Sequence, residues 1–174
     1  MAITKIQSES MNLADTYAFT GTVTGAGEAN TPYFHVYLSS NQTVSDNTQT
    51  KVQLNTELFD SANAFDNTTN YRFTPQTAGK YYIYAAARAD VSPSTLSKIQ
   101  MNIYKNGSTI TGIGQQATDF RDNRGCDTGV FGAGIIQLNG STDYVELYVQ
   151  VDGDSTVTAK GNDTFLGGFL LSST

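Results

Sequence analysis

The stretch from Thr50 to Ala87 constrains the fold of this chain more than any other part of the sequence. Three strand-like runs, KVQL, YRF and KYYIYAAA, are separated there by two connections rich in turn residues, DSANAFDNTTN and TPQTAG. Such spacing is typical of a β-sheet. Near the other end, Phe165 to Leu171 reads FLGGFLL, and a wholly apolar strand is expected to be buried on both faces. Together these runs predict an all-β domain.

The chain continues this pattern from Tyr33 onward. Asn-Gly pairs at 106–107 and 139–140 favour tight hairpin turns between strand-like runs. The sequence shows no sustained helical period and no alternation of helices with strands. We therefore expect a two-sheet sandwich or jelly roll, which hides sheet edges better than an open sheet. The expected strands are residues 33–38, 50–55, 70–74, 80–90, 98–105, 109–114, 129–138, 143–151 and 164–171.

A length of 174 residues fits one domain with a short arm. Residues 1–30 differ from the rest, because their strand-like and turn-like segments are too short to bury much and end in the Gly-rich run GAGEAN. We expect an N-terminal arm over 1–30 and a head domain over 31–174. The arm would either cover a head, its own or a neighbour's, or dock on a partner. Its apolar contact residues would be Ile3, Ile6, Leu13, Tyr17 and Phe19.

The charge balance argues against a nucleic-acid partner. The chain has 10 Lys and Arg residues against 16 Asp and Glu residues, a net charge of -6, and no basic cluster that could neutralise phosphates. Its apolar residues occur in short runs, so membrane insertion is not expected. The opening MAITKIQSES lacks the basic and apolar segments of a secretory signal, which predicts folding in a cytoplasm.

The sequence contains none of the common catalytic motifs. A nucleophile elbow, a phosphate-binding Gly-rich loop before a helix, zinc-type histidine spacing and a dinucleotide fingerprint are all missing. The single cysteine, Cys126, lies in a polar Gly-rich run, and the single histidine, His35, lies in an expected strand. A catalytic pair of thiol and imidazole is therefore not supported. We expect a protein that is not an enzyme.

One acidic turn could hold a cation. Asp152 and Asp154, with Asp143 upstream and Asp163 downstream, offer the hard oxygen ligands that calcium prefers. The alternative is a plain turn, because Asp-Gly sequences are common in turns without any metal. No other cofactor is expected.

A mixed-charge segment lies in a connection of about 14 residues, which is longer than usual and therefore a candidate contact surface. Its charges could instead pair with one another. The residues concerned are Asp119, Arg121, Asp122, Arg124 and Asp127.

Several motifs resemble the globular head of complement component one, subcomponent q, a domain shared in shape with tumour necrosis factor. They are the Phe-Asp turns within 58–66, RFTP at 72–75 and GKYY at 79–82, followed by DYVELYVQ, DGD and TFLGGFLL in the family's order. The resemblance covers roughly Tyr33 to Leu171. It departs at Thr74-Pro75, where the family has a cysteine, and no collagen-like stalk precedes the domain. It implies a jelly roll of about ten antiparallel strands in two sheets.

The resemblance also implies a homotrimer, since heads of this family pack as threefold bundles, often with calcium near the axis. The tyrosine-rich runs YFHVYL, KYYIYAAA and DYVELYV would turn rings to the core on one side and to neighbouring subunits on the other. The residues expected at the trimer interface are Tyr81, Tyr82, Tyr84, Tyr148, Phe165 and Phe169.

The opening MAITKIQSESMNLADTYAFTGTV resembles virion proteins of tailed bacteriophages, especially marine and cyanobacterial ones. That resemblance implies a capsid decoration (cement) protein, a head fibre or the tip of a tail fibre. A fibre tip normally follows a shaft, and no heptads or repeats precede this domain. Our leading hypothesis is a virion protein whose arm attaches a trimeric head to the major capsid protein. The alternative is an adhesin that binds a host-surface glycan or protein through residues 115–128.

Overall fold

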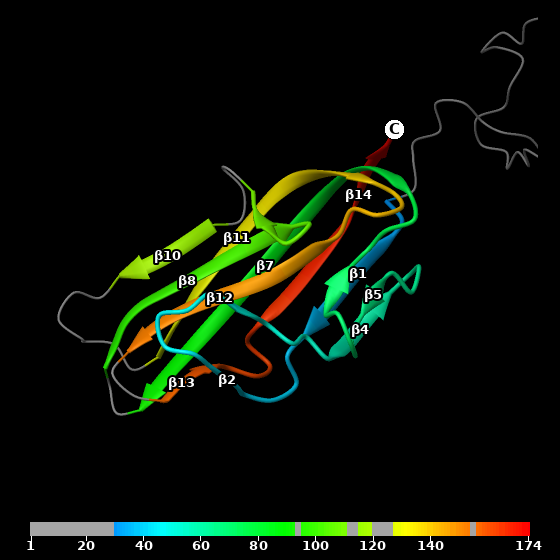
Figure 1. Ribbon diagram of the computed structural model, residues 1–174. Coiled ribbons are helices and arrows are strands. Elements are labelled where there is room, and N and C mark those ends of the chain that lie inside the picture. The colour runs from blue at the N-terminus through cyan, green and yellow to red at the C-terminus, as the bar shows by residue number, and fades with distance from the viewer. Residues whose placement is uncertain (1–29, 93–94, 111–114, 120–126, 154–155) are drawn as a thin grey trace, which may run out of the picture.

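The computed structural model describes residues 30–92, 95–110, 115–119, 127–153 and 156–174, and all regular structure in these ranges is antiparallel β-sheet (Figure 1). The described residues contain no helix that is long and apolar enough to cross a membrane. The strands are β1 (Tyr33–Tyr37), β2 (Gln42–Val44), β3 (Thr50–Lys51), β4 (Thr56–Asp60), β5 (Phe65–Asp66), β6 (Arg72–Phe73), β7 (Ala78–Ser92), β8 (Leu96–Lys105), β9 (Ser108–Thr109), β10 (Gln115–Asp119), β11 (Asp127–Asn139), β12 (Val145–Gly153), β13 (Thr156–Ala159) and β14 (Phe165–Ser173).

The first sheet, here sheet A, is organised around the long strand β7. Its order is β2-β13-β7-β14-β1-β4, and β11 pairs with the other edge of β7. The β7 and β11 strands stay in register from Ala78 opposite Asn139 to Asp90 opposite Asp127. This sheet therefore joins strands from both ends of the sequence, and Figure 1 shows β7, β14 and β1 side by side.

The second sheet, here sheet B, has the order β10-β8-β12-β6-β5, with β3 paired to β12 and β9 paired to β8. Its two longest strands, β8 and β12, pair from Lys105 opposite Val145 to Leu96 opposite Gly153, with an irregularity at Asp152 and Gly153. Sheet B lies against sheet A, so the molecule is a two-layer sandwich (Figure 1).

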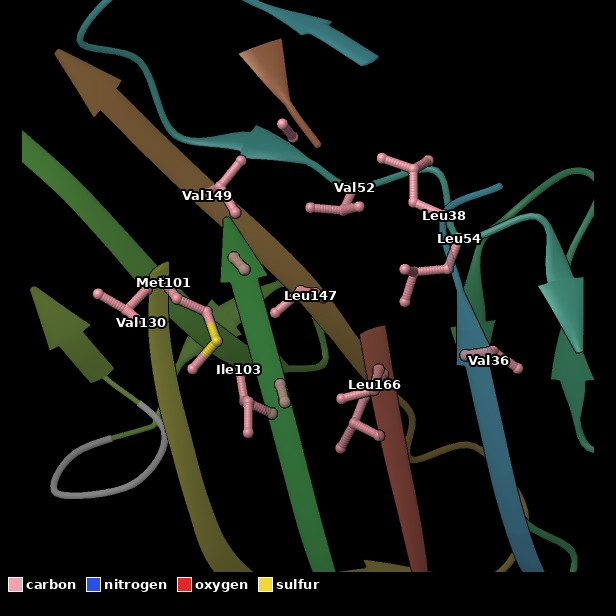
Figure 2. Close-up of a cluster of buried hydrophobic side chains, with 14 of the residues drawn as sticks. Val36, Leu38, Val52, Leu54, Met101, Ile103, Val130, Leu147, Val149 and Leu166 are labelled. Carbon is pink, nitrogen blue, oxygen red and sulfur yellow. The ribbon is translucent and has the colours of Figure 1, made fainter. Parts of the chain in front are cut away.

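The core lies between the two sheets and follows from the alternation in their strands. Along β7 every second residue from Tyr81 to Val91 is buried. Figure 2 shows part of this core, with Met101 of β8 and Leu147 of β12 among the apolar side chains. Burial of one such side chain contributes about 1.5–3 kcal/mol. The all-β sandwich expected from the sequence is confirmed.

The short strands are the part of the fold that was not expected from the sequence. Strands β2, β4, β5, β10 and β13 lie in segments that we expected to be connections. Of the strand expected over 109–114, Thr109 belongs to β9 and Ile110 lies outside it, while residues 111–114 lie outside the described ranges. Such strands span only two to five residues, too few to show a clear alternation, and are held by pairing to neighbouring strands.

Only the first of the two Asn-Gly pairs forms the expected tight hairpin. Asn106 and Gly107 join β8 to β9 with φ angles of 52° and 75°, which a type I′ turn requires. At the second pair, β11 ends at Asn139 and the connection to β12 is longer. The side chain of Asn139 explains this, because its Oδ1 accepts hydrogen bonds from three following N–H groups at 2.9–3.0 Å.

Candidate subunit interface

The outer face of sheet A carries aromatic side chains from neighbouring strands. On β7 the residues between the core positions, including Tyr82 and Tyr84, point away from sheet B. On β14 Phe165 and Phe169 do the same, and Phe169 lies opposite Tyr82 in the register. The centroids of the Tyr82 and Phe169 rings are 5.6 Å apart. Two adjacent strands thus present one continuous layer of rings.

The flanking strands of sheet A extend this layer. Phe59 on β4 lies opposite His35 on β1, while Ile135 on β11 lies opposite Tyr82, and Phe131 lies opposite Ala86. We call the whole set the aromatic face. Its members are Tyr33, His35, Tyr37, Phe59, Tyr82, Tyr84, Phe131, Ile135, Phe165 and Phe169.

Several members of the aromatic face are exposed to an unusual degree for large apolar side chains. The exposed fraction is 57% for Phe131, 54% for Ile135, 46% for Phe59 and 44% for Tyr33. Scattered apolar residues on a surface are ordinary, but a contiguous group of them marks an interaction site. This face therefore has the composition of a surface that another protein covers.

The centre of the aromatic face is held by a contact between β7 and β1. The Tyr84 ring lies across Gly167 of the intervening strand β14, where an added Cβ would come within 2.4 Å of the ring's Cζ. The Tyr84 hydroxyl is 3.0 Å from Nδ1 of His35. Burial lowers the pKa of His35, and burial together with Tyr82 raises the pKa of Tyr84. Both groups are therefore uncharged at neutral pH.

One end of the face is polar. Arg88 donates two hydrogen bonds to Asp127, at 2.7 Å and 2.5 Å, and a third to Asp163 at 2.7 Å. Lys160 lies 3.4 Å from Asp90 and 3.5 Å from Asp127. The hydrogen bonds from Arg88 hold the pKa of Asp127 below its usual range. We call these five residues the charged end of sheet A.

The outer face of sheet B is different, because its amide side chains are hydrogen bonded to one another. Gln100 donates to Asn102 at 3.3 Å, Asn102 donates to Gln49 at 2.9 Å, and Gln49 donates to Gln150 at 3.0 Å. Gln150 in turn donates to Asn47 Oδ1 at 2.5 Å. We call this chain of five residues the amide ladder.

Sheet B also satisfies its charged and aromatic side chains internally. The buried carboxylate of Glu146 forms an ion pair with Lys51, and the Tyr104 and Tyr148 rings stack with centroids 4.0 Å apart. Across the described residues, every buried side-chain nitrogen or oxygen has a hydrogen-bond partner. The two outer faces therefore differ in chemistry: sheet B is largely polar and its side chains are paired with one another, whereas sheet A, apart from its charged end, is largely apolar and partly exposed.

The structure brings four of the six expected interface residues together, namely Tyr82, Tyr84, Phe165 and Phe169. The expectation for Tyr81 is wrong, because this side chain is fully buried in the core and its hydroxyl donates to the Thr77 carbonyl at 2.8 Å. Its burial raises the pKa of Tyr81 to about 12.

Tyr148 is also separated from the other expected interface residues, since it lies on the outer face of sheet B. Six members of the aromatic face were not expected from the sequence. Alternation in YFHVYL and in VFGAGII was the available signal for most of them. The missed residues are Tyr33, His35, Tyr37, Phe59, Phe131 and Ile135.

The mixed-charge segment falls mostly outside the described residues. Arg121, Asp122 and Arg124 lie there, and the side chain of Asp119 is not described although its backbone belongs to β10. Asp127 does not belong to a loop: it begins β11 and pairs with Arg88. The arm residues Ile3, Ile6, Leu13, Tyr17 and Phe19 and the cysteine Cys126 also lie outside the described ranges.

The described part of the acidic turn shows a structural role. The Asp152 carbonyl accepts a hydrogen bond from Ser97 Oγ at 3.1 Å, and Asp154 is not described. Asp143 pairs with Lys105, and Asp163 pairs with Arg88. Within the described ranges, no three His, Cys, Asp or Glu side chains converge as metal ligands would.

Comparison with known proteins supports the fold. No protein-family model matches the sequence, and no curated protein matches it. The crystal structure of murine APRIL at pH 5.0 matches with a TM-score of 0.59 and 12% identity over 80% of this chain and 98% of that one. The structure of Eiger TNF from S. frugiperda matches with a TM-score of 0.55 and 15% identity over 82% of this chain and 95% of that one. The chain thus has the jelly-roll fold of these tumour-necrosis-factor-like proteins.

Proposed function

We propose that this chain is a non-enzymatic structural protein of a tailed-phage virion, and that it forms a homotrimeric head through the aromatic face. The observation that supports the trimer is the contrast between the two outer faces. Phe131 and Ile135 are more than half exposed on sheet A, whereas the amides of sheet B are hydrogen bonded to one another. An apolar layer of this kind gains free energy when another subunit covers it.

The chemistry of the face suits an interface between identical subunits. Tyrosine and phenylalanine rings bring large contact areas with few rotatable bonds, so little entropy is lost when they are buried. Three faces meeting around an axis would shield one another from water. The charged end of sheet A would then form a polar border, where Arg88 is already paired with Asp127 and Asp163.

Within the virion we propose a capsid decoration or head-fibre role, with residues 1–30 attaching the head to the major capsid protein. Asn30 donates a hydrogen bond to the Leu170 carbonyl at 2.8 Å, so Asn30 itself lies beside β14. Threefold symmetry would place the three arms at equal heights along the axis. Each bound trimer would stabilise the shell by mass action, because it binds the assembled form.

Two measurements test this proposal. Light scattering of the full chain at micromolar concentration is expected to give three times the subunit mass of 18.7 kDa. A chain without residues 1–30 is expected to remain trimeric and to lose co-sedimentation with capsids. A mass of one subunit would refute the trimer, and equal capsid binding by the shortened chain would refute the role of the arm.

A second candidate function is a host-surface adhesin at a tail tip. The observation that favours it is a polar surface hollow on the β5 and β6 side of the head, where the Arg72 guanidinium lies 4.2 Å from the Tyr144 ring centroid. Immunogold labelling of intact virions separates the two candidates, because label over the shell supports decoration and label at the tail end supports the adhesin. The residues that line the hollow are Asn63, Ala64, Phe65, Asp66, Asn70, Arg72, Thr74 and Gln76.

A further inference from the structure

His35, the single histidine of the chain, lies within the aromatic face on β1. Three rings surround its imidazole, with centroid distances of 5.0 Å to Phe165, 5.8 Å to Tyr84 and 5.9 Å to Phe59. These rings come from three different strands, β14, β7 and β4. The histidine is half-buried already in the single subunit, and its remaining surface opens onto the outer side of the sheet.

Among the described residues, the surroundings of His35 offer a positive charge only aromatic rings and a hydroxyl. The attraction of a ring for a cation, about 0.5–2 kcal/mol, offsets only part of the cost of removing a charge from water. From β7 it faces the hydroxyl of Tyr84, with Tyr82 beyond, and from β14 it faces only phenylalanine and glycine positions. On its own strand the outward neighbours are Tyr33 and Tyr37.

The acidic groups nearest in the sheet are Glu57 and Asp60 of β4. They lie opposite Val36 and Phe34, which point to the core side, and not opposite His35. No carboxylate in the described ranges forms an ion pair with His35. A protonated imidazole here would have water as its main source of solvation.

The hydrogen bond with Tyr84 does not by itself favour one charge state. The tyrosine hydroxyl can donate to a neutral Nδ1 or turn to accept from a protonated one. The charge state matters through water, because covering the face removes the solvent that a charged imidazole needs. A neutral imidazole among aromatic rings loses much less.

We propose that His35 makes assembly through the aromatic face dependent on pH, so that subunits associate while its imidazole is neutral and separate when it is protonated. This inference rests on the proposed trimer and adds a means of controlling it. The partner is a second and third copy of the same chain, and the controlling ligand is the proton.

The change in the pKa of His35 on association sets the direction in which association depends on pH. Burial lowers the pKa of His35 from 6.5 in the single subunit, and further burial in a trimer lowers it again. Association is therefore strongest above the free-subunit pKa and is lost as the pH falls through it. Each histidine changes the association constant by up to about tenfold per pH unit, so three histidines change it by up to about a thousandfold.

The fold is expected to survive in this pH range. The carboxylates of Asp66, Asp127 and Asp143 have pKa values lowered by hydrogen bonds within the head, so they stay charged to lower pH than ordinary carboxylates. Glu57 behaves in the opposite way, because burial and the neighbouring Asp60 raise its pKa. Protonation of Glu57 removes a charge and would favour association at low pH.

Sedimentation velocity of the full chain from about pH 8 to about pH 4.5 tests the proposal. The wild type is expected to change from trimer to folded monomer below pH 6.5. His35→Gln, which keeps a partner for Tyr84 and cannot gain a proton in this range, is expected to remain a trimer throughout. His35→Lys, charged throughout, is expected to be monomeric at every pH. Far-UV circular dichroism on the same samples reports whether the subunits stay folded.

The outcomes separate this inference from the proposed function. A wild type that is monomeric at every pH contradicts the trimer and the inference together. A wild type and His35→Gln that are both trimeric throughout, or that dissociate at the same pH, contradict the inference alone. Glu57→Gln is the matched control, because an acid transition that moves with Glu57 and not with His35 also overturns the assignment.

Discussion

Among the described residues, the rings on the outer face of sheet A contact one another and stay partly exposed, whereas the outer face of sheet B carries amides, an ion pair and two stacked tyrosines that are paired with one another. Both faces belong to the same sandwich and lie over the same core. Packing of the core therefore does not explain which residues occupy the outward positions of β1, β7, β11 and β14. Their outward positions include large apolar side chains in a contiguous group, which is typical of an interaction site.

The largest expected effect comes from placing a charge on the aromatic face. Phe131→Asp should leave the subunit folded, because this side chain is more than half exposed, but should bring three carboxylates into the proposed trimer interface. We expect association to weaken by about a thousandfold, about 4 kcal/mol. Sedimentation equilibrium measures the association constant.

Thr109→Asp is the matched control, since it adds the same charge at an exposed position of sheet B. This variant should leave the mass of the assembled protein in sedimentation unchanged. Equal weakening by both variants would contradict the difference between the two faces.

A smaller effect is expected from breaking the ion pair of sheet B. Lys51→Met leaves the buried carboxylate of Glu146 without its cation, which should lower the free energy of unfolding by about 3 kcal/mol. Urea denaturation measures the change. Adding Glu146→Gln to the same chain should restore much of the loss; if the single variant is as stable as the wild type, sheet B is not held by this pair.

Two adjacent glycines of β14, Gly167 and Gly168, face opposite sides of sheet A, so their substitution should affect different properties. A Cβ on Gly168 would lie 2.7 Å from the Tyr82 carbonyl oxygen and 2.5 Å from Ile83 Cδ1, so Gly168→Ala should lower the free energy of unfolding by about 2 kcal/mol. At Gly167 the added Cβ meets the Tyr84 ring, which can move outward. Gly167→Ala should change subunit stability by less than about 0.5 kcal/mol.

Because Gly167→Ala displaces Tyr84 from His35, it should instead lower the association constant of the subunits by about tenfold. Thermal denaturation and sedimentation of the two variants measure both quantities. If Gly167→Ala lowered the free energy of unfolding and Gly168→Ala weakened association, Gly167 would belong to the core and Gly168 to the interface.

The smallest effect concerns the charged end of sheet A. Asp127→Asn removes the carboxylate that Arg88 holds, and a partly exposed pair of this kind contributes about 1 kcal/mol or less. Since the pKa of Asp127 is lowered in the folded state, this contribution is present above the unfolded-state pKa of about 3.9 and is lost as the pH falls below it. Wild type and variant should therefore differ in stability at neutral pH and converge in acid. A difference that persists in acid would contradict this assignment.

The sequence predicted the sandwich and part of the aromatic face because alternation is a local property. In KYYIYAAA, adjacent tyrosines must point to opposite sides, but the pattern does not say which side is the core. Tyr82 and Tyr84 were assigned correctly to the outer side, and Tyr81 was not. The decisive information is that Tyr81 shares its side with Ile83 and packs against Phe73 of the other sheet.

The rest of the site depends on pairing between distant strands, which no local pattern encodes. Phe59 reaches His35 only through the irregular register of β4 on β1, and Phe131 and Ile135 join the face only because β11 pairs with β7. Tyr148 was misplaced for the same reason, because the sheet to which β12 belongs is a matter of topology. The pairing of Asp127 with Arg88 likewise required the register of β11.

Hydroxyl-radical footprinting of the full chain shows whether the aromatic face is a subunit interface, because it reports which side chains are covered by another subunit. In a single subunit Phe131 and Tyr33 are 57% and 44% exposed and should be oxidised readily. We expect both to be protected in the assembled protein and to become reactive on dilution, while Thr109→Tyr, a reporter on sheet B, reacts equally in both conditions. Oxidation of Phe131 and Tyr33 at the same rate before and after dilution would contradict the assignment of the aromatic face as the subunit interface.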